Sequence, residues 1–416
     1  MRQHIGRWLK VTLWLVPVLG LCGWAGIAAL PAIGPRDISA AVCSTGSTPL
    51  GAARSVSPLR REVRAGPVET LPGMPPVPNP SNLYSAAGAG QLSPAVGGAL
   101  SRIYVPNLRS NDVYVIDPQR LAVVDRFKVG AIPQHVVPSW DLQTLWVANN
   151  GTRRRYGSLT PVDPKTGSPG QAVPVDDPYN LYFTPDGRSA IVVAERRKRL
   201  DFRDPHTMAL QQSIAAPGCS GINHADFAID GRYAIFTCEF RGGGLVKVDL
   251  VNHQVLGYLK LSKRGMPQDI RISPDGTTFY VADMHADGVY LVDGESFRQT
   301  DFIPTGVGTH GLYPSRDARL LYVTNRAEGS VSVVDFATRR VLSRWMIPGP
   351  ASPDMGGVSA DGSTLWLSGR YNAEVYAIDT RTGRLRARIP VGLGPHGLCV
   401  WPQPGRYSLG HTGITR

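Results

Sequence analysis

The chain has 416 residues, 42% of them hydrophobic, and a formal net charge of +12. This composition excludes a disordered chain and predicts a globular protein with a large buried core. The charge would favour contact with acidic surfaces such as phospholipid or nucleic acid. However, the basic clusters are short and have no interleaved aromatic residues, so they are not typical of a groove that stacks bases.

Residues 1–43 have the pattern of an export segment. Three basic residues precede an apolar run over residues 11–33, and no acidic residue occurs before Asp37. Such a pattern directs export, and the run is about as long as the roughly 20 residues that span a bilayer. We expect either a cleaved signal peptide or an uncleaved membrane anchor. In both cases the rest of the chain is extracytoplasmic, either secreted or membrane-anchored.

Residues 44–98 are rich in Pro, Gly and Ala, and the stretch 72–78 contains four prolines. Proline-rich sequence disfavours both helix and strand, so we expect an extended linker here.

Residues 99–416 contain a repeat. A short alternating strand that ends in Asp recurs at intervals of 41 to 46 residues, at Asp117, Asp163, Asp204, Asp249, Asp293, Asp335 and Asp379. Turns such as Pro-Asp-Gly at 185–187 and 274–276 precede further apolar strands. Four short strands per repeat of this length indicate the blade of a WD40-like β-propeller.

The two ends of the repeat region complete one another. The first copy begins at residues 102–105 without an inner strand, and residues 397–402 form an inner strand with nothing after it. We therefore predict an all-β, seven-bladed β-propeller with a strand-swapped closure between the N- and C-terminal strands. An eighth blade would have to come from residues 34–98, whose composition does not suit one. Residues 404–413 lie beyond the repeat, and the sequence assigns them no role.

The repeat over residues 273–293, with its Ser-Pro-Asp-Gly turn and Phe-Tyr-Val-Ala-Asp strand, resembles the YVTN-type propeller repeat. Over residues 100–402 the chain is similar to YncE-like secreted β-propellers, a group close to the cytochrome d1-type propellers. The resemblance implies the fold more strongly than a function. Some members of the family are reported to bind DNA, and the d1 proteins carry a haem, but no haem-ligand motif of theirs is matched here.

Polar residues gather where the inner strands of such blades begin. These starts line one mouth of the central channel, and the second strands of the blades end at the same face. The residues at the strand starts are His135, Asn180, His224, Asp269, His310, Asp354 and His396. The strand ends add Glu195, Glu239 and Asp283, with Arg326 and Arg370 close behind.

We expect this ring to bind a ligand. The four histidines, His135, His224, His310 and His396, are candidate ligands for copper, zinc or iron. The arginines could instead pair with a carboxylate or phosphate. The alternative is a purely structural lining that caps strand ends and holds channel water.

Two of the five cysteines, Cys219 and Cys238, fall on one face of the same blade. In an exported protein this favours a disulfide; the alternatives are buried free thiols or a metal site shared with His224. The sequence has no CxxC or CxxCH motif.

The sequence favours a binding or scaffold protein that recognises a small ligand or protein partner through this face. It also has no GxSxG, HExxH or P-loop motif, so no catalytic residue is assigned. Two other functions remain open. One is a metal-dependent enzyme, either a lactonase-like hydrolase or a redox protein. The other is a binder of nucleic acid or an anionic polymer.

Overall fold

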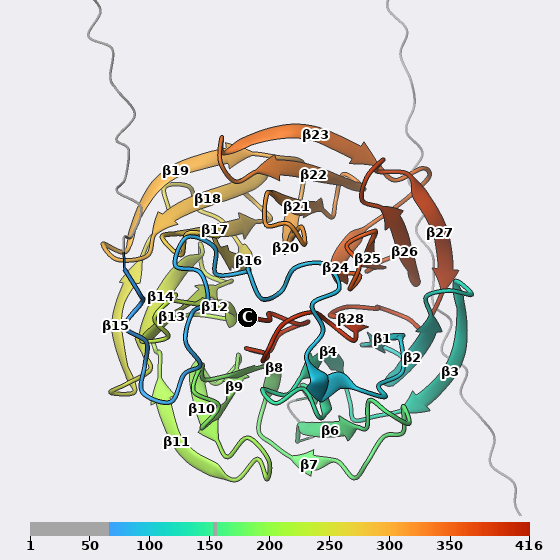
Figure 1. Ribbon diagram of the computed structural model, residues 1–416, viewed down its shortest axis with the longest axis horizontal. Coiled ribbons are helices and arrows are strands. Elements are labelled where there is room, and N and C mark those ends of the chain that lie inside the picture. Colours follow the sequence, from blue (N-terminus) through green and yellow to red (C-terminus); the bar gives the residue numbers. More distant parts are fainter. Residues whose placement is uncertain (1–65, 153–155) are drawn as a thin grey trace, which may run out of the picture. The chain divides into compact units, whose positions relative to one another are not determined.

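The computed structural model describes residues 66–152 and 156–416. Within these residues, seven antiparallel sheets of four strands each surround a central axis (Figure 1). The prediction of a seven-bladed β-propeller is confirmed. The described residues contain no helix long and apolar enough to cross a membrane. The expected export segment, residues 1–43, and the first part of the expected linker lie outside the described residues.

Each blade runs from a buried inner strand to an exposed outer strand. The inner strands are β28 (Cys399–Trp401), β4 (Pro133–Pro138), β8 (Pro178–Phe183), β12 (Ile222–Phe227), β16 (Pro267–Ile272), β20 (Thr309–Pro314) and β24 (Pro353–Val358). The second strands are β1 (Arg102–Asn107), β5 (Leu145–Asn149), β9 (Ala190–Ala194), β13 (Tyr233–Cys238), β17 (Thr278–Asp283), β21 (Leu320–Asn325) and β25 (Thr364–Gly369). The third strands are β2 (Asp112–Asp117), β6 (Ser158–Val162), β10 (Arg199–Arg203), β14 (Gly244–Asp249), β18 (Gly288–Asp293), β22 (Ser330–Asp335) and β26 (Glu374–Asp379). The outer strands are β3 (Ala122–Lys128), β7 (Val173–Pro174), β11 (Leu210–Ala215), β15 (Gln254–Leu259), β19 (Arg298–Pro304), β23 (Arg340–Met346) and β27 (Leu385–Pro390).

The ring closes as the two incomplete repeats predict. Strand β28 pairs antiparallel with β1, with Tyr104 opposite Cys399 and Arg102 opposite Trp401. The last strand of the chain thus becomes the inner strand of the blade that β1, β2 and β3 build. This pairing covers the edge of β1, which would otherwise lack a partner on the side of the channel.

The recurring aspartates fix the turns between strands. Asp379, at the end of β26, accepts hydrogen bonds from the backbone N–H groups of Arg381 and Thr382. Asp275 accepts from the Ser273 hydroxyl and from the N–H of Thr277, and Gly276 follows it with a φ of +70°. The side chain of Asp substitutes for a backbone acceptor, and Gly takes the left-handed conformation that the turn requires.

The core is a ring of apolar clusters, each shared by neighbouring blades. In one of them, Tyr182 and Phe202 pack with Phe227 and Phe236 of the next blade. A blade cannot bury both of its faces alone, so this packing requires the complete ring.

Residues 66–98, which we expected to form an extended linker, pack on the propeller instead. The Leu83 N–H donates to the Pro274 carbonyl (2.8 Å), and the Tyr84 hydroxyl donates to the Ile272 carbonyl (2.7 Å). Both side chains are buried. The segment contains only a short 3-10 helix, η1 (Pro94–Val96). Its prolines disfavour regular structure, as expected, but its apolar side chains pack against the apolar side chains of the blades. In Figure 1 it crosses in front of the channel.

The C-terminal tail, residues 403–416, closes the same end of the channel (Figure 1). It runs beside β8, where the Phe183 N–H donates to the Leu409 carbonyl (3.0 Å) and the His411 N–H donates to the Leu181 carbonyl (2.9 Å). Gly410 has a φ of +99°, and a Cβ there would lie 2.5 Å from the Leu181 carbonyl oxygen. Only glycine fits this approach.

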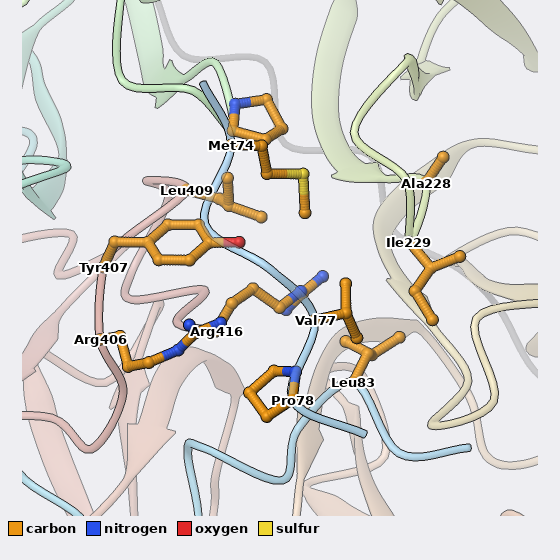
Figure 2. A pocket seen from close by; sticks show the side chains of 11 residues that line it. Met74, Val77, Pro78, Leu83, Ala228, Ile229, Arg406, Tyr407, Leu409 and Arg416 are labelled. Carbon is orange, nitrogen blue, oxygen red and sulfur yellow. The ribbon is translucent and has the colours of Figure 1, made fainter. Parts of the chain in front are cut away.

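The tail and the N-terminal segment meet in an apolar seam (Figure 2). Met74, Val77 and Leu83 face Tyr407 and Leu409 of the tail there. This end of the channel therefore has a two-part cover made from the beginning and the end of the described chain.

Removing a large side chain from the closing strand should weaken the whole ring. Trp401 is 1% exposed and lies in a cluster shared with Tyr104. We expect Trp401→Ala to lower the free energy of unfolding by about 3–5 kcal/mol in urea titrations. The control Leu342→Ala, on an outer strand where that side chain is 60% exposed, should change it by less than about 0.5 kcal/mol. Equal effects would contradict a closing role for β28.

Candidate functional site in the central channel

A β-bulge lies near the start of six inner strands. The register against the second strand shifts near the second or third residue of β4, β8, β12, β16, β20 and β24. A bulge interrupts the alternation of side chains between the two faces of a strand. It therefore allows two consecutive residues to contribute to the channel.

The predicted ring of polar residues consequently forms two layers. We expected one ring just before the inner strands, whereas these residues are mostly the second and third residues of the strands themselves. The mouth layer contains Gln134, Tyr179, Asn223, Gln268, His310, Asp354 and His396. The deep layer contains His135, Asn180, His224, Asp269, Gly311, Met355 and Gly397.

Asp354 is the centre of the mouth layer. Its carboxylate is fully buried and lies 2.9 Å from Arg326 Nη2, 2.7 Å from His396 Nδ1 and 3.1 Å from His310 Nδ1. Arg370 Nε is further away, at 3.8 Å. Burial would raise the pKa of Asp354, but the Arg326 guanidinium and the two imidazoles outweigh it and hold the pKa well below its ordinary value. Asp354 is therefore an anion that accepts a hydrogen bond from His396 and forms an ion pair with Arg326.

Tyr179 contacts His396 within the mouth layer. Its hydroxyl lies 3.4 Å from His396 Nε2, while His396 Nδ1 faces Asp354. Burial, followed by the positive charge of Arg370, lowers the pKa of His396 to about 4. A neutral His396 that donates to Asp354 from Nδ1 can accept a hydrogen bond from the Tyr179 hydroxyl at Nε2.

Glu195 and Glu239 are neighbours at the mouth. Burial, followed by the charge of Glu239, raises the pKa of Glu195 to about 8. Burial also raises the pKa of Glu239, although Asn223 donates a hydrogen bond to that carboxylate (2.8 Å). Two carboxyl groups in such surroundings hold a proton at neutral pH.

The deep layer brings together His135, His224 and a residue from the tail, His411. His135 Nδ1 lies 3.0 Å from the Tyr179 carbonyl oxygen, and His224 Nδ1 lies 3.2 Å from that of Gln268. The two Nε2 atoms are 3.3 Å apart. His411 joins them, so that ligand atoms of the three imidazoles lie within 4.8 Å of one another, and all three side chains are fully buried.

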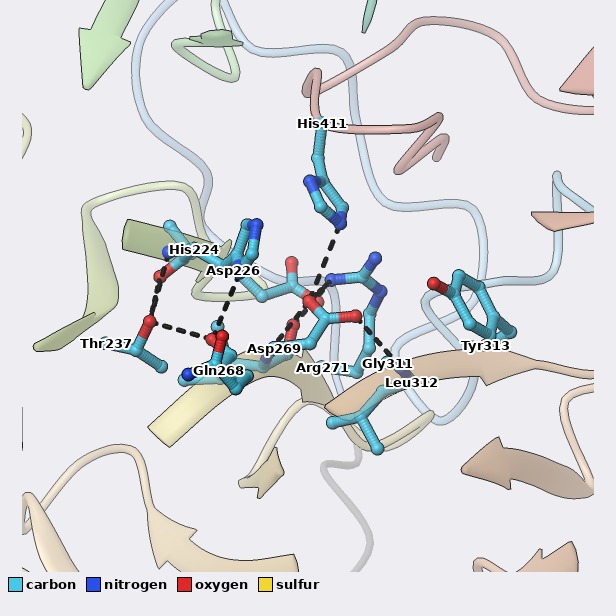
Figure 3. Close-up of polar contacts among 12 residues, drawn as sticks. His224, Asp226, Thr237, Gln268, Asp269, Arg271, Gly311, Leu312, Tyr313 and His411 are labelled. Carbon is cyan, nitrogen blue, oxygen red and sulfur yellow. Dashed lines mark hydrogen bonds and ion pairs between the residues drawn. The ribbon is translucent and has the colours of Figure 1, made fainter. Parts of the chain in front are cut away.

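Beneath the histidines lies a set of buried ion pairs (Figure 3). Arg271 Nη1 donates to Asp269 (2.8 Å), and Arg416 of the tail donates to Asp226 (2.5 Å). His411 Nε2 lies 3.6 Å from Asp269 Oδ1. Each buried carboxylate is thus balanced by a guanidinium, as buried charges require.

The four histidines that we grouped as metal ligands follow one another through the channel, and the rings of His135 and His396 are in contact, with centroids 4.9 Å apart. His135 and His224 face each other, whereas His310 and His396 contact Asp354 in the mouth layer. His411, which the repeat could not reveal, takes a place beside the first pair. Its signal in the sequence was a Gly-His-Thr-Gly stretch after the last repeat.

Asp283 does not join the channel cluster among the described residues. Its carboxylate accepts hydrogen bonds from the N–H groups of Met266, His285 and Ala286, at 2.9, 3.0 and 2.9 Å. Asp283 therefore stabilises the neighbouring loops, which agrees with the alternative of a purely structural role. Cys219 and Cys238, the two cysteines that we expected to pair, are joined by a disulfide, and Cys399 is buried and free.

The proton held by Glu195 should make stability depend on pH. The folded carboxyl has a pKa of about 8 against an ordinary value of 4.5, so between these values the folded state binds a proton that the unfolded state releases. Between these values, stability falls as pH rises. We expect Glu195→Gln to show a smaller fall in the free energy of unfolding than the unchanged protein in urea titrations from about pH 5 to 8.

Glu295→Gln serves as the control for this measurement because that residue is exposed. It should keep the pH dependence of the unchanged protein. An identical slope in the Glu195 variant would mean that Glu195 is ionised in the fold.

Comparison with known proteins identifies the family. A model of the YNCE-like beta-propeller matches residues 63–404. A relative called YncE, from Salmonella typhi, is 24% identical over 281 residues, which cover 62% of this chain and 74% of that protein. The YncE protein of Escherichia coli O157:H7 is 28% identical over 170 residues, or 38% of this chain. That match spans about half of the relative's own length, 47%.

Solved structures share the fold at low sequence identity. Hydrazine synthase from Kuenenia stuttgartiensis is 16% identical with a TM-score of 0.59, and the match covers 70% of this chain and 95% of that one. The dihydro-heme d1 dehydrogenase NirN, also 16% identical, has a TM-score of 0.54 over 72% of this chain and 75% of its own. At this identity the likeness concerns the fold alone. The family match covers most of the sequence, and the chain belongs to the YNCE-like β-propeller family.

Proposed function

We propose that this protein binds a small anionic molecule at the open mouth of its channel. The observation that carries the proposal is the pair Arg326 and Arg370. Both guanidinium groups converge on the single carboxylate of Asp354, at 2.9 and 3.8 Å. Arg326 Nε and Arg370 Nη1 are buried and have no hydrogen-bond partner among the described residues. A carboxylate or phosphate is the acceptor that such groups favour.

Among the described residues, one end of the channel is covered, so a ligand would approach from the other end. The tail and residues 66–98 cover the end that faces the viewer in Figure 1. The opposite end carries Arg370, whose side chain is 21% exposed, and Tyr371, which is 69% exposed. Arg326 Nη1 donates to the Tyr371 hydroxyl (3.2 Å). Tyr371 thus stands at the rim, where it can contact a ligand that the arginines hold.

The remaining polar groups at the mouth favour a ligand that also carries hydroxyl or amide groups. Asn223 and Gln134 each have a buried side-chain oxygen without a hydrogen-bond partner among the described residues. Buried polar atoms without partners are costly, so a donor from a ligand would stabilise them. The proton on the Glu195–Glu239 pair limits the negative charge that would repel an anion.

We also propose that binding takes place outside the cytoplasm. The basic and apolar pattern of residues 1–43 supports export. The Cys219–Cys238 disulfide supports an oxidising compartment, because such bonds are rare in reducing cytosol.

Arginine variants test the anion site. Panels of dicarboxylates, sugar acids and phosphate esters, with inorganic phosphate included, can be screened by thermal shift and then by calorimetry. We expect at least one anion to raise the melting temperature of the unchanged protein, and this rise to be lost in Arg370→Gln. Arg340→Gln, on the exposed outer strand β23, should keep it. The affinity should also fall as pH rises through about 8, where Glu195 ionises. A complete absence of shifts, or shifts that persist in Arg370→Gln, would contradict the proposal.

The disulfide tests the compartment. Protein recovered from outside the cytoplasm should carry Cys219 and Cys238 in oxidised form, as shown by peptide mass after alkylation of the unfolded chain. Protein that lacks residues 1–43 and stays in the cytoplasm should carry them reduced. We expect reduction to lower the free energy of unfolding by about 3 kcal/mol, because the bond closes a loop of 19 residues. Reduced cysteines in the exported fraction would argue against the proposed location.

A further inference from the structure

We propose that the deep layer binds a zinc-type transition-metal ion through His135 and His224, with His411 of the tail as a third ligand. This site is separate from the anion site at the mouth, and neither proposal requires the other.

The hydrogen bonds of His135 and His224 decide where their protons lie. Each Nδ1 faces a backbone carbonyl oxygen, that of Tyr179 and that of Gln268, at 3.0 and 3.2 Å. A carbonyl oxygen only accepts hydrogen bonds, so each Nδ1 must carry the proton. The Nε2 of each neutral ring then presents a lone pair. Metal-binding histidines typically have this arrangement, with the second nitrogen donating to a carbonyl or carboxylate.

The two lone pairs face each other. The Nε2 atoms are 3.3 Å apart, with no proton left for a hydrogen bond between them. A bridging proton would make one ring an imidazolium. Both rings are fully buried and lie against the further imidazoles of His396 and His411, so this charge is disfavoured. A metal cation would instead receive both lone pairs and remove their repulsion.

The separation fits a tetrahedral ion. Two nitrogens that each lie 2.0–2.1 Å from such an ion are about 3.3–3.4 Å apart. A linear two-nitrogen site would need them about 4 Å apart. The observed 3.3 Å therefore favours tetrahedral geometry, and three imidazoles form a ligand set that suits zinc.

Glycine makes room for this arrangement. Gly397 occupies the deep-layer position next to His135, and a Cβ there would collide with the His135 ring. Its N–H donates to the Gln134 carbonyl (2.9 Å), which holds the segment before β28 against the start of β4. The close approach of backbone to imidazole fixes the direction of His135 and explains a glycine at this place.

His411 supplies the third imidazole from outside the repeats. Its ring enters the channel from the tail, on the side away from the inner strands in Figure 3. The Asn180 amide oxygen accepts from the Leu181 N–H, so its NH2 group donates to His411 Nδ1 (2.9 Å) and the proton of a neutral His411 lies on Nε2, 3.6 Å from Asp269 Oδ1. His411 can therefore become a ligand through Nε2 only when this proton moves to Nδ1 and the contact with Asn180 changes. Ligand atoms of the three residues lie within 4.8 Å of one another, so a small movement of the tail would complete the site.

Metal binding can be measured without knowledge of any activity. The full-length protein, purified without a polyhistidine tag and stripped with a chelator, is titrated with Zn²⁺ and separately with Co²⁺. We expect about one ion per chain, a higher melting temperature and, with cobalt, the intense visible absorption of a tetrahedral site. His135→Ala and His224→Ala should abolish this binding. His411→Ala should weaken it and change the cobalt spectrum, which tests the role of the tail.

The controls separate this site from the surface. His206 and His285 are exposed, and their alanine variants should bind as the unchanged protein does. Should either core variant fail to fold, His135→Gln and His224→Gln keep a polar side chain of similar size, and circular dichroism shows whether each is folded. No stoichiometric binding by the unchanged protein would overturn the proposal. Binding that persists in folded His135→Gln and His224→Gln would also overturn it.

Discussion

The pairing of β28 with β1 is the interaction on which the rest of the structure depends. Without it, one blade would lack its inner strand and the ring would open at that point. The apolar clusters lie between blades, so an open ring would also expose core side chains. The channel exists only because the ring closes, since its lining comes from the starts of seven inner strands.

The channel concentrates charge where a core would normally be apolar. Asp354, Asp269 and Asp226 are fully buried, and each has an arginine within reach. A buried ion pair stabilises a fold little by comparison with apolar packing, because both charges lose their hydration. Their stabilising effect therefore does not by itself explain why they lie at the axis. The mouth has arginine N–H groups to spare, and the deep layer has imidazole lone pairs to spare.

The architecture could be predicted from the sequence because each blade repeats the same physical solution. The aspartates that end the third strands and the Pro-Asp-Gly turns recur at blade spacing, so a periodic argument finds them. The polar residues that line the channel were also identified from the sequence, although most of them lie within the inner strands and not just before them. Their division into two layers was not predicted, because a β-bulge leaves no clear mark in a sequence. The structure shows the bulge in β4, where Gln134 and His135 both contribute to the channel.

Features outside the repeat escaped prediction for a different reason. Nothing periodic distinguishes His411 or Arg416, so their place in the channel depends on where the tail folds back. Residues 66–98 were expected to be a linker because their prolines resist helix and strand. A segment without regular structure can still be held in place, and Leu83 and Tyr84 hold this one through buried side chains. The composition of this segment predicts its lack of regular secondary structure but not its contacts with the propeller.

The bulges also divide each inner strand into a part that packs between the blades and a part that lines the channel. Beyond the bulge, each inner strand packs against its neighbours and keeps the ring intact; at the bulge, it offers two side chains to the axis. Substitution at most of these twelve positions can therefore change the lining of the channel while the rest of each blade remains unchanged. The propeller is a frame that holds six such pairs of residues. Relatives with the same frame are free to differ in chemistry at the axis, which is one physical reason why this architecture by itself identifies no activity.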